Sequence, residues 1–205
     1  MDLTLVATFL PPLIIVLYIL YSDRYPEPID LCVKTFILGC ILCVPAGYLN
    51  AFFIPDRSDA FLAGLTEEPL KFAAIYFYIR TKAHFDEPMD AIVYGTLISL
   101  GFATLENYEY VYQWANDPQA VALARAFSAI PLHACCGIVM GYYFGLYAFK
   151  GNNNLNLIKS LIIPIAFHSA YNYFSVTNYL LMFLVLIILI IFANKLHKEL
   201  KNEQA

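Results

Sequence analysis

The chain has 205 residues, of which 60% are hydrophobic and 14% charged, and its net charge is −4. Apolar runs of about 20 residues recur along it, whereas a membrane β-barrel would show alternating segments of about ten residues. These features predict an all-α, polytopic integral membrane protein, with residues 1–205 forming a single membrane-embedded helical domain. The charges are spread out without a basic patch, which argues against a nucleic-acid partner.

Seven apolar segments are long enough to cross a lipid bilayer. They are residues 3–21, 31–54, 60–79, 88–107, 129–149, 157–174 and 178–194. The first lacks a basic flank and a small-residue cleavage motif, so we expect a retained span rather than a signal peptide. The aromatic-rich connection 108–127 is expected to carry a short helix at the membrane interface, and residues 195–205 form a basic tail.

The lysines and arginines predict how the chain crosses the membrane. With the N-terminus outside, nine of them fall on the cytoplasmic side: Arg24, Lys34, Arg80, Lys82, Lys150, Lys159, Lys195, Lys198 and Lys201. The outer side receives only Arg57 and Arg125. This positive-inside bias predicts a cytoplasmic C-terminus.

The third predicted span, 60–79, carries three charged residues, Glu67, Glu68 and Lys71. Three charges near a helix centre cost about 8–10 kcal/mol, and the apolar residues of the span return only about 2.5–5 kcal/mol. Pairing of Lys71 with a glutamate three or four residues earlier reduces the deficit. Pro69 is expected either to kink this helix or to lie in its first turn. The span therefore requires a polar cavity built by other helices.

Other predicted spans supply polar residues at the same depth. In the predicted topology Glu106, His133, His168 and Asn172 all lie in outer halves or at outer ends of their helices, level with the two glutamates. A carboxylate could take a proton from water, and an imidazole could orient that water or protonate the leaving amine. His168 and Asn172 are four residues apart and could stabilise an oxyanion. The predicted catalytic set is Glu67, Glu68, Glu106, His133, His168 and Asn172, with Lys71 as a supporting ion pair.

Four motifs in this order resemble the PrsW family of intramembrane proteases, relatives of the CAAX prenyl proteases. They are Glu67-Glu68-x-x-Lys71, the stretch 101–107 ending in Glu106-Asn107, His133 ahead of glycines 137, 141 and 145, and His168-x-x-x-Asn172. The resemblance covers residues 60–175. The CAAX branch usually has Glu-Glu-x-x-x-Arg, so Lys71 favours the PrsW branch.

The resemblance implies an intramembrane endopeptidase in a prokaryotic plasma membrane. Its substrate would be a single-span membrane protein, such as an anti-sigma factor that is first cut outside the cytoplasm. The resemblance also implies that both glutamates of the pair are central to catalysis, with His133 or His168 assisting. It places the cut on the same side of the membrane as the positive-inside bias does.

Other interpretations remain open at this stage. No cofactor is required by the sequence, yet zinc is an alternative, with Glu67, Glu68, Glu106, His133 and His168 as ligands. Buried carboxylates and histidines also mark ion pathways, so a proton- or cation-coupled transporter is a further alternative, as is a non-catalytic membrane scaffold. The nearly apolar cytoplasmic halves of the third to sixth spans argue against a continuous ion path.

Several remaining polar residues are assigned structural roles. Asp90 and Arg125 are expected to be boundary charges, and His84 and His197 bystanders in cytoplasmic segments. Tyr94 and Tyr110 are candidates to line the cavity. Five cysteines lie in apolar runs without CxxC spacing, which favours buried small hydrophobes over a disulfide framework. They are Cys32, Cys40, Cys43, Cys135 and Cys136.

Overall fold

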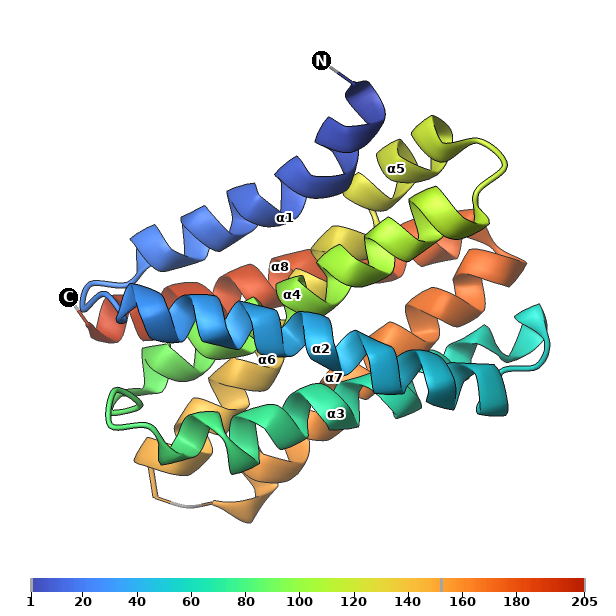
Figure 1. Ribbon diagram of the computed structural model, residues 1–205. Helices are drawn as coiled ribbons and strands as arrows, with labels where there is room; N and C mark the ends of the chain where they lie inside the picture. The colour runs from blue at the N-terminus through green and yellow to red at the C-terminus, as the bar shows by residue number, and fades with distance from the viewer. Residues whose placement is uncertain (1, 152, 205) are drawn as a thin grey trace.

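Figure 1 shows the computed structural model, which describes residues 2–151 and 153–204 as a bundle of long helices. The α-helices are α1 (Leu3–Ser22), α2 (Ile29–Phe53), α3 (Ala63–Phe77), α4 (Pro88–Glu109), α5 (Pro118–Ala126), α6 (Ala129–Phe149), α7 (Asn154–Thr177) and α8 (Tyr179–Glu203). Short helical turns are η1 (Arg57–Leu62), η2 (Ile79–Thr81) and the π-helical turn η3 (Tyr110–Trp114). Over these residues, the all-α prediction is confirmed.

Within the described residues, five helical stretches are long and apolar enough to cross a membrane. They are α1, α2, α4 with η3, α5 with α6, and α8. The two remaining predicted spans are helical as well, but α3 has 15 residues, which is about 22 Å of helix, and α7 is not among the five. A multi-pass membrane protein is therefore established, while the number of seven spans stays a prediction.

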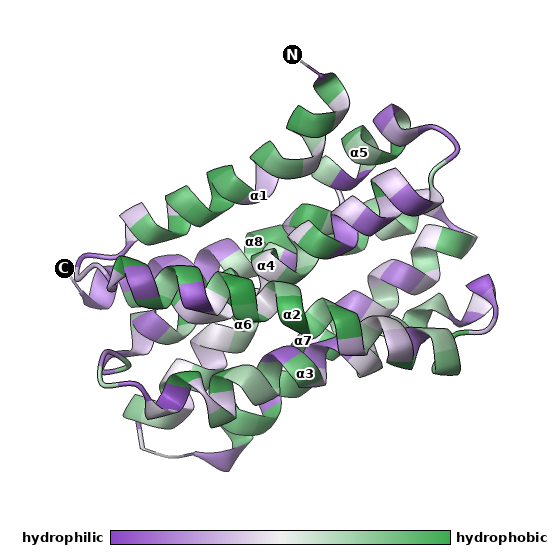
Figure 2. Cartoon of the chain, in the orientation of Figure 1, coloured by the Kyte–Doolittle hydropathy of each residue, from purple (hydrophilic) through white to green (hydrophobic). Residues whose placement is uncertain are grey.

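Helix α4 is the centre of the bundle. In its most apolar stretch 83% of the residues are buried, against 22% in α1 and 28% in α8. Figure 2 shows α1 as almost uniformly hydrophobic, as expected for a helix that faces lipid. The predicted glycine stripe of α6 packs on α4: a Cβ atom at Gly141 would lie 2.2 Å from the carbonyl oxygen of Ala91. This close backbone contact holds α4 and α6 in register.

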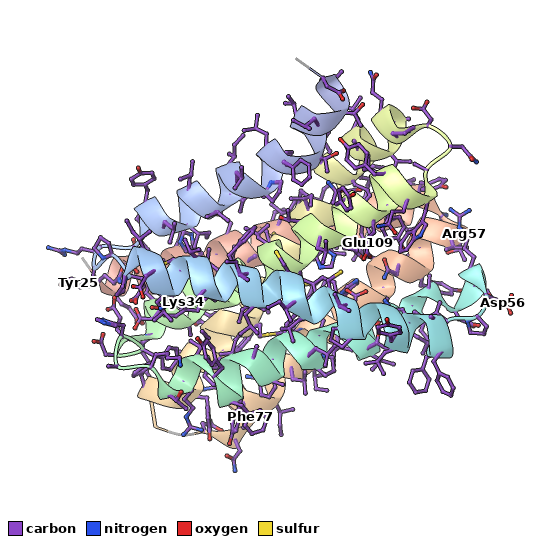
Figure 3. The ribbon with its side chains drawn as sticks, viewed as in Figure 1. Tyr25, Lys34, Asp56, Arg57, Phe77 and Glu109 are labelled. Atoms are coloured by element: carbon purple, nitrogen blue, oxygen red, sulfur yellow. The ribbon has the colours of Figure 1, made fainter. Side chains whose placement is uncertain are left out.

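The bundle has two polar ends, which Figure 3 marks by labelled residues. Asp56, Arg57 and Glu109 lie at one end, which we call the Asp56 end, and Tyr25 and Lys34 lie at the other, the Tyr25 end. Predicted cytoplasmic basic residues gather at the Tyr25 end, where Arg24 donates to the Gln204 carbonyl and Lys150 pairs with Glu203. This grouping agrees with the expected orientation, which stays a prediction.

Three local expectations need correction. Pro69 is the seventh residue of α3, because η1 runs directly into the helix at Ala63; the first-turn alternative is therefore wrong. Helix α4 continues through η3 to Trp114, beyond the predicted end at 107. The basic tail is helical to Glu203 because apolar side chains of α8 remain buried as far as Leu200.

The five cysteines are free thiols, four of them buried, as predicted.

Candidate active site

The charged residues of α3 are fully buried and paired. Glu67, Glu68 and Lys71 have relative exposures of 1%, 0% and 0%. The Lys71 Nζ atom lies 2.7 Å from Glu68 Oε1 and 3.7 Å from Glu67 Oε2. The ion pairing predicted from the i+3 and i+4 spacing is thus present, and Lys71 neutralises Glu68 more closely than Glu67.

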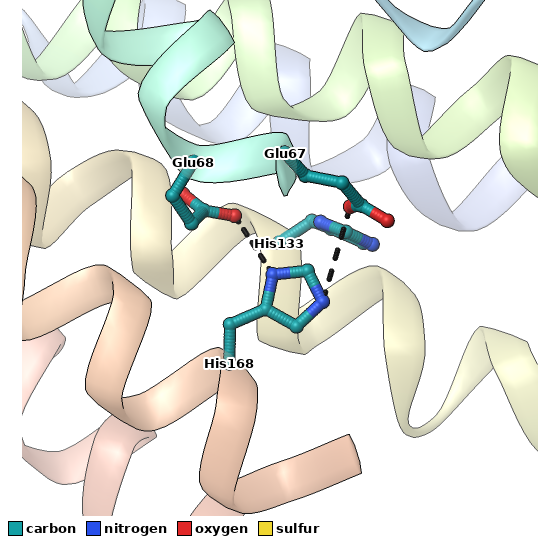
Figure 4. A group of neighbouring side chains, drawn as sticks. All are labelled: Glu67, Glu68, His133 and His168. Carbon is teal, nitrogen blue, oxygen red and sulfur yellow. Dashed lines mark hydrogen bonds and ion pairs between the residues drawn. The ribbon is translucent and has the colours of Figure 1, made fainter. Parts of the chain in front are cut away.

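Two imidazoles, from α6 and α7, complete the cluster (Figure 4). His168 Nδ1 lies 2.9 Å from Glu68 Oε1, and its Nε2 lies 3.9 Å from Glu67 Oε2. His133 Nδ1 lies 3.0 Å from Lys71 Nζ, and the two imidazole rings are perpendicular with centroids 5.0 Å apart. We call Glu67, Glu68, Lys71, His133 and His168 the active-site cluster.

A glycine explains how α7 reaches α3 at this level. A Cβ atom on Gly64, one turn before the glutamates, would lie 2.4 Å from Ser169 Oγ and 2.9 Å from the Ile165 carbonyl oxygen. Only a glycine allows this approach without a shift of the backbone. The close contact places His168 beside the carboxylate of Glu68.

The hydrogen-bond partners of each ring identify its donor nitrogen. Because the Lys71 ammonium has only donors, it donates to His133 Nδ1, and His133 Nε2–H then donates to Glu106 Oε2 at 3.1 Å. His168 Nδ1–H donates to Glu68, and its Nε2 atom lies 3.9 Å from Glu67 Oε2. The contacts of His133 thus fix its Nε2–H tautomer, and His168 presents its Nε2 atom to Glu67.

Arg125 is part of the site, although the sequence suggested a boundary charge. Its Nη2 atom donates to Glu106 Oε2 at 2.5 Å, and its Nε atom donates to Asn107 Oδ1 at 2.8 Å. Asn107 Nδ2 in turn donates to the Thr8 carbonyl oxygen. Helix α5 folds back against α1 and η3, which brings Arg125 to Glu106 and Asn107 at the end of α4, a contact beyond the expected boundary role. Spacing along the sequence could not predict this fold-back.

Asn50 is a second residue that sequence reasoning missed. Its Nδ2 atom donates to Glu67 Oε1 at 3.0 Å, and its Oδ1 atom accepts a hydrogen bond from Thr66 Oγ1. A single amide near the end of the apolar segment 31–54 was the available signal. Asn50 orients the Glu67 carboxylate and leaves its second oxygen turned toward the cluster.

A cavity of about 810 Å³ opens beside the cluster. Its lining includes the predicted site residues Glu67, Glu106, His133, His168 and Asn172. Glu68 and Lys71 are not among the described residues that line the cavity.

The aromatic residue Tyr110 lines this cavity as expected. Tyr94 does not, because it lies near the Tyr25 end, where its hydroxyl donates to Glu27. Asp90 and His197 also depart from expectation. Both are buried: Asp90 caps α4, and His197 Nε2 lies 2.8 Å from Ser22 Oγ. His84 is exposed, as expected of a bystander.

The donor set is compatible with a metal ion. Ligand atoms of Glu67, Glu68, His133 and His168 lie within 4.8 Å of one another. Among the described groups, Glu67 Oε2 and Glu68 Oε2 are buried without a hydrogen-bond partner. Two carboxylates and two imidazoles suit zinc, and Glu106 behind His133 is the carboxylate that commonly orients a metal-binding histidine. Glu106 therefore fits a supporting position better than the ligand position considered from sequence.

Buried carboxylates and imidazoles around a cavity, inside a helical membrane bundle, form a site that is suited to acid–base hydrolysis. Residues 27–194 match a family described as "PrsW family intramembrane metalloprotease". Because this match spans most of the chain, the protein belongs to the PrsW family of intramembrane proteases. It is thus a membrane peptidase, and the resemblance seen in the sequence is confirmed.

Similar proteins come from several bacteria. A protease PrsW of Clostridioides difficile (strain 630) is 31% identical over 97% of this chain and 90% of its own length. Those of Geobacillus kaustophilus and Bacillus subtilis are 33% and 32% identical, each over 80% of this chain and over 75% and 78% of their own lengths. These likenesses indicate a prokaryotic membrane protein that acts on membrane proteins. No solved structure matches the chain.

Proposed function

We propose that this protein hydrolyses a peptide bond of a membrane-anchored protein, with Glu67 as the general base. One observation carries the assignment: Glu67 lines the cavity and has a buried oxygen, Oε2, without a hydrogen-bond partner among the described residues. Glu68 lies behind the cavity wall, paired with Lys71 and His168. Glu106 faces the cavity but is held by Arg125 and His133.

The charges of the site support this division of roles. Three carboxylates, Glu67, Glu68 and Glu106, meet two fixed cations, Lys71 and Arg125, so one negative charge remains. The weakest pairing is that of Glu67, at 3.7 Å from Lys71. A carboxylate that is poorly neutralised accepts a proton most readily, so Glu67 is suited to take one from water.

Two further residues assist in this proposal. His168 Nε2 lies 3.9 Å from Glu67 Oε2, and both residues line the cavity, so His168 can pass the proton from Glu67 to the leaving amine. The Asn172 amide, which lines the same cavity, can donate to the oxyanion that forms on the scissile carbonyl. Glu68 and Lys71 hold His168 and His133 in position.

The proposal also includes a metal ion, which the family description and the donor set support. Glu67, Glu68, His133 and His168 would hold it, and it would polarise the scissile carbonyl and the attacking water. The Lys71 ammonium must then move away, since it already contacts Glu68 and His133. The lysine and the ion would therefore compete for the same carboxylates.

We also propose that the cut lies near the outer face of a prokaryotic plasma membrane. The cavity is at the Asp56 end, and the basic residues gather at the opposite end, so the positive-inside rule turns the cavity outward. The substrate class follows from the family resemblance: a single-span protein such as an anti-sigma factor, held in the lipid bilayer beside the cavity.

The test is cleavage of a single-span model substrate by detergent-purified protein, with and without a chelator. Glu67→Gln should abolish cleavage while the variant elutes as a folded species in gel filtration. The matched control is Glu203→Gln, an exposed carboxylate paired with Lys150 at the far end, which should cleave like the wild type.

Each outcome has a meaning. Cleavage retained by Glu67→Gln would refute the assignment of the base. Loss in the variant together with loss on chelation would favour the metal-dependent form, whereas loss in the variant alone would favour hydrolysis by the glutamate without an exchangeable metal.

A further inference from the structure

A second group of carboxylates, two of them buried and two half-buried, lies at the Tyr25 end, away from the cavity. It comprises Asp23, Glu27, Glu87 and Asp90, which we call the acidic cluster. Asp23 follows α1, Glu27 precedes α2, and Glu87 and Asp90 form the capping box at the start of α4. The cluster thus joins the α1–α2 loop to the helix at the centre of the bundle.

Gln204, Tyr94 and two backbone N–H groups, all of them neutral, donate hydrogen bonds to the acidic cluster. Gln204 Nε2, at the end of α8, donates to Asp23 Oδ1 at 2.8 Å and to Glu87 Oε1 at 2.5 Å. The Tyr94 hydroxyl donates to Glu27, and the backbone N–H groups of residues 86 and 87 donate to Asp90 Oδ2 at 2.8 Å. These contacts satisfy some of the oxygens but cancel none of their charge.

Two oxygens of the acidic cluster are left over. Asp23 Oδ2 and Asp90 Oδ1 are buried and accept no hydrogen bond from a donor among the described residues, and the Asp90 carboxyl lies against that of Glu27. The residues themselves are 7% and 0% exposed, so water does not replace the missing donors. A buried carboxylate oxygen without a donor is stabilised by a cation or by a proton.

The spacing of the oxygens indicates which partner fits. Ligand atoms of Asp23, Glu87 and Asp90 all lie within 4.8 Å of one another. Calcium binds oxygen at about 2.3–2.6 Å, so two of its ligands are at most about 4.6–5.2 Å apart. Zinc prefers nitrogen or sulfur ligands, which the acidic cluster does not offer among the described residues. An all-oxygen set of this width suits a hard divalent cation.

We propose that Asp23, Glu87 and Asp90 bind a calcium-type divalent cation, with Glu27 at the edge of the site. The ion supplies the charge that the two unpartnered oxygens lack. Because its ligands come from the end of α1 and the start of α4, and Gln204 of α8 bridges two of them, the bound ion fastens three helices together at the Tyr25 end. This site is independent of the cavity and of the protease mechanism.

The experiment measures Ca²⁺ binding to the chelator-treated, full-length protein in detergent by titration calorimetry, and its thermal unfolding with and without Ca²⁺. The wild type should bind Ca²⁺ in or below the range of about 10⁻⁴–10⁻³ M and unfold at a higher temperature with it. Asp23→Asn should weaken binding by about tenfold or more and remove the thermal shift. Asp56→Asn, a change in an exposed loop at the other end, is the matched control and should behave as wild type.

Two further variants keep the test decisive. Glu87→Gln should reproduce the loss if Asp23→Asn does not fold, and Glu67→Gln should leave Ca²⁺ binding intact because it alters only the active-site cluster. The proposal is overturned if the wild type binds no Ca²⁺ at millimolar concentration, or if both acidic-cluster variants bind like the wild type. Loss of binding in Glu67→Gln alone would place the ion in the active site and would equally overturn it.

Discussion

Both ends of the bundle contain buried carboxylates, but the groups that contact these carboxylates differ between the two ends. At the Asp56 end, Lys71 and Arg125 lie within hydrogen-bond distance of Glu68 and Glu106, so the cations are built into the chain. At the Tyr25 end, the acidic cluster is contacted by an amide, a hydroxyl and backbone N–H groups. Burial of charge is costly in both places.

This difference has a functional consequence. Fixed cations hold most of the active-site charge in place and leave one carboxylate, Glu67, under-compensated at the cavity wall. In the proposed mechanism this arrangement leaves Glu67 available as the base, while Glu68 and Glu106 stay paired with Lys71 and Arg125. The acidic cluster, with neutral donors, gains stability from a cation or a proton taken from solution. The Asp56 end is therefore suited to the proposed hydrolysis. At the Tyr25 end, the stability of the fold should depend on the cations and protons in solution.

The largest expected effects come from substituting the two glutamates of α3, and they should differ between Glu67 and Glu68. Glu67→Gln is expected to lower kcat by about 10²–10⁴-fold, the usual contribution of a general base, with little change in unfolding temperature. Glu68→Gln should instead destabilise the fold by about 3–5 kcal/mol, because it removes the closest partner of a buried lysine. Steady-state cleavage and thermal unfolding of both variants would measure the contrast. Equal loss of stability in the two variants would contradict it.

Arg125→Gln should have the next largest effect. Arg125 touches Glu106, which orients His133, so its loss should reduce kcat by about 10–100-fold, as is typical of groups that orient a ligand or a base. KM should change less than kcat, because Arg125 acts through His133. Arg125→Lys should restore part of the rate, since it keeps the charge on Glu106. A KM effect alone would indicate substrate binding instead.

Lys71→Met tests whether the lysine and a metal ion compete for the same carboxylates. Removing a cation held 2.7 Å from Glu68 and 3.0 Å from His133 should strengthen zinc binding by about tenfold or more. Zinc content of the purified variant and its zinc affinity, both measured without reference to cleavage, give the result. Unchanged affinity would mean that the ion does not occupy the space around Lys71 Nζ.

The sequence predicted which residues of the candidate site would lie together, because each charged or polar residue in an apolar segment is costly unless it meets a partner. Two glutamates and a lysine in an apolar segment had to meet polar partners, and only a few intramembrane residues, among them His133 and His168, were available. The glycine spacing after His133 also predicted a close helix contact, which the structure has against α4. Hydropathy and spacing were enough for these features.

The rest depended on how the connections fold, which periodicity does not encode. Arg125 lies in α5, which folds back against α1 and η3, so its contact with Glu106 was not foreseeable. The acidic cluster is scattered over residues 23–90 and is closed by Gln204 at the other end of the chain. Asp90 looked like a boundary charge because nothing nearby in sequence indicated that α8 and the α1–α2 loop would bury it.

The smallest expected effect is on the pH dependence of folding stability. It tests the acidic cluster separately from the active-site cluster. Burial and neighbouring acids raise the pKa of both Glu27 and Glu87 above the ordinary value of 4.5, so the folded protein holds their protons more tightly than the unfolded chain. The folded state should therefore lose stability as pH rises from about 4.5 through these raised pKa values. The loss should be about 1 kcal/mol or less, because solvent screens these partly exposed carboxylates.

Glu27→Gln should reduce this slope in chelator-treated protein to the part that Glu87 contributes, because the amide at position 27 has no proton to lose. Saturating Ca²⁺ should flatten it in the wild type as well, since the ion replaces the protons as the positive partner. The measurement is the unfolding temperature between pH 5 and 8, with Asp56→Asn as the control variant. A slope that neither Glu27→Gln nor Ca²⁺ changes would show that the Tyr25 end is already neutralised, and the contrast between the two ends would then disappear.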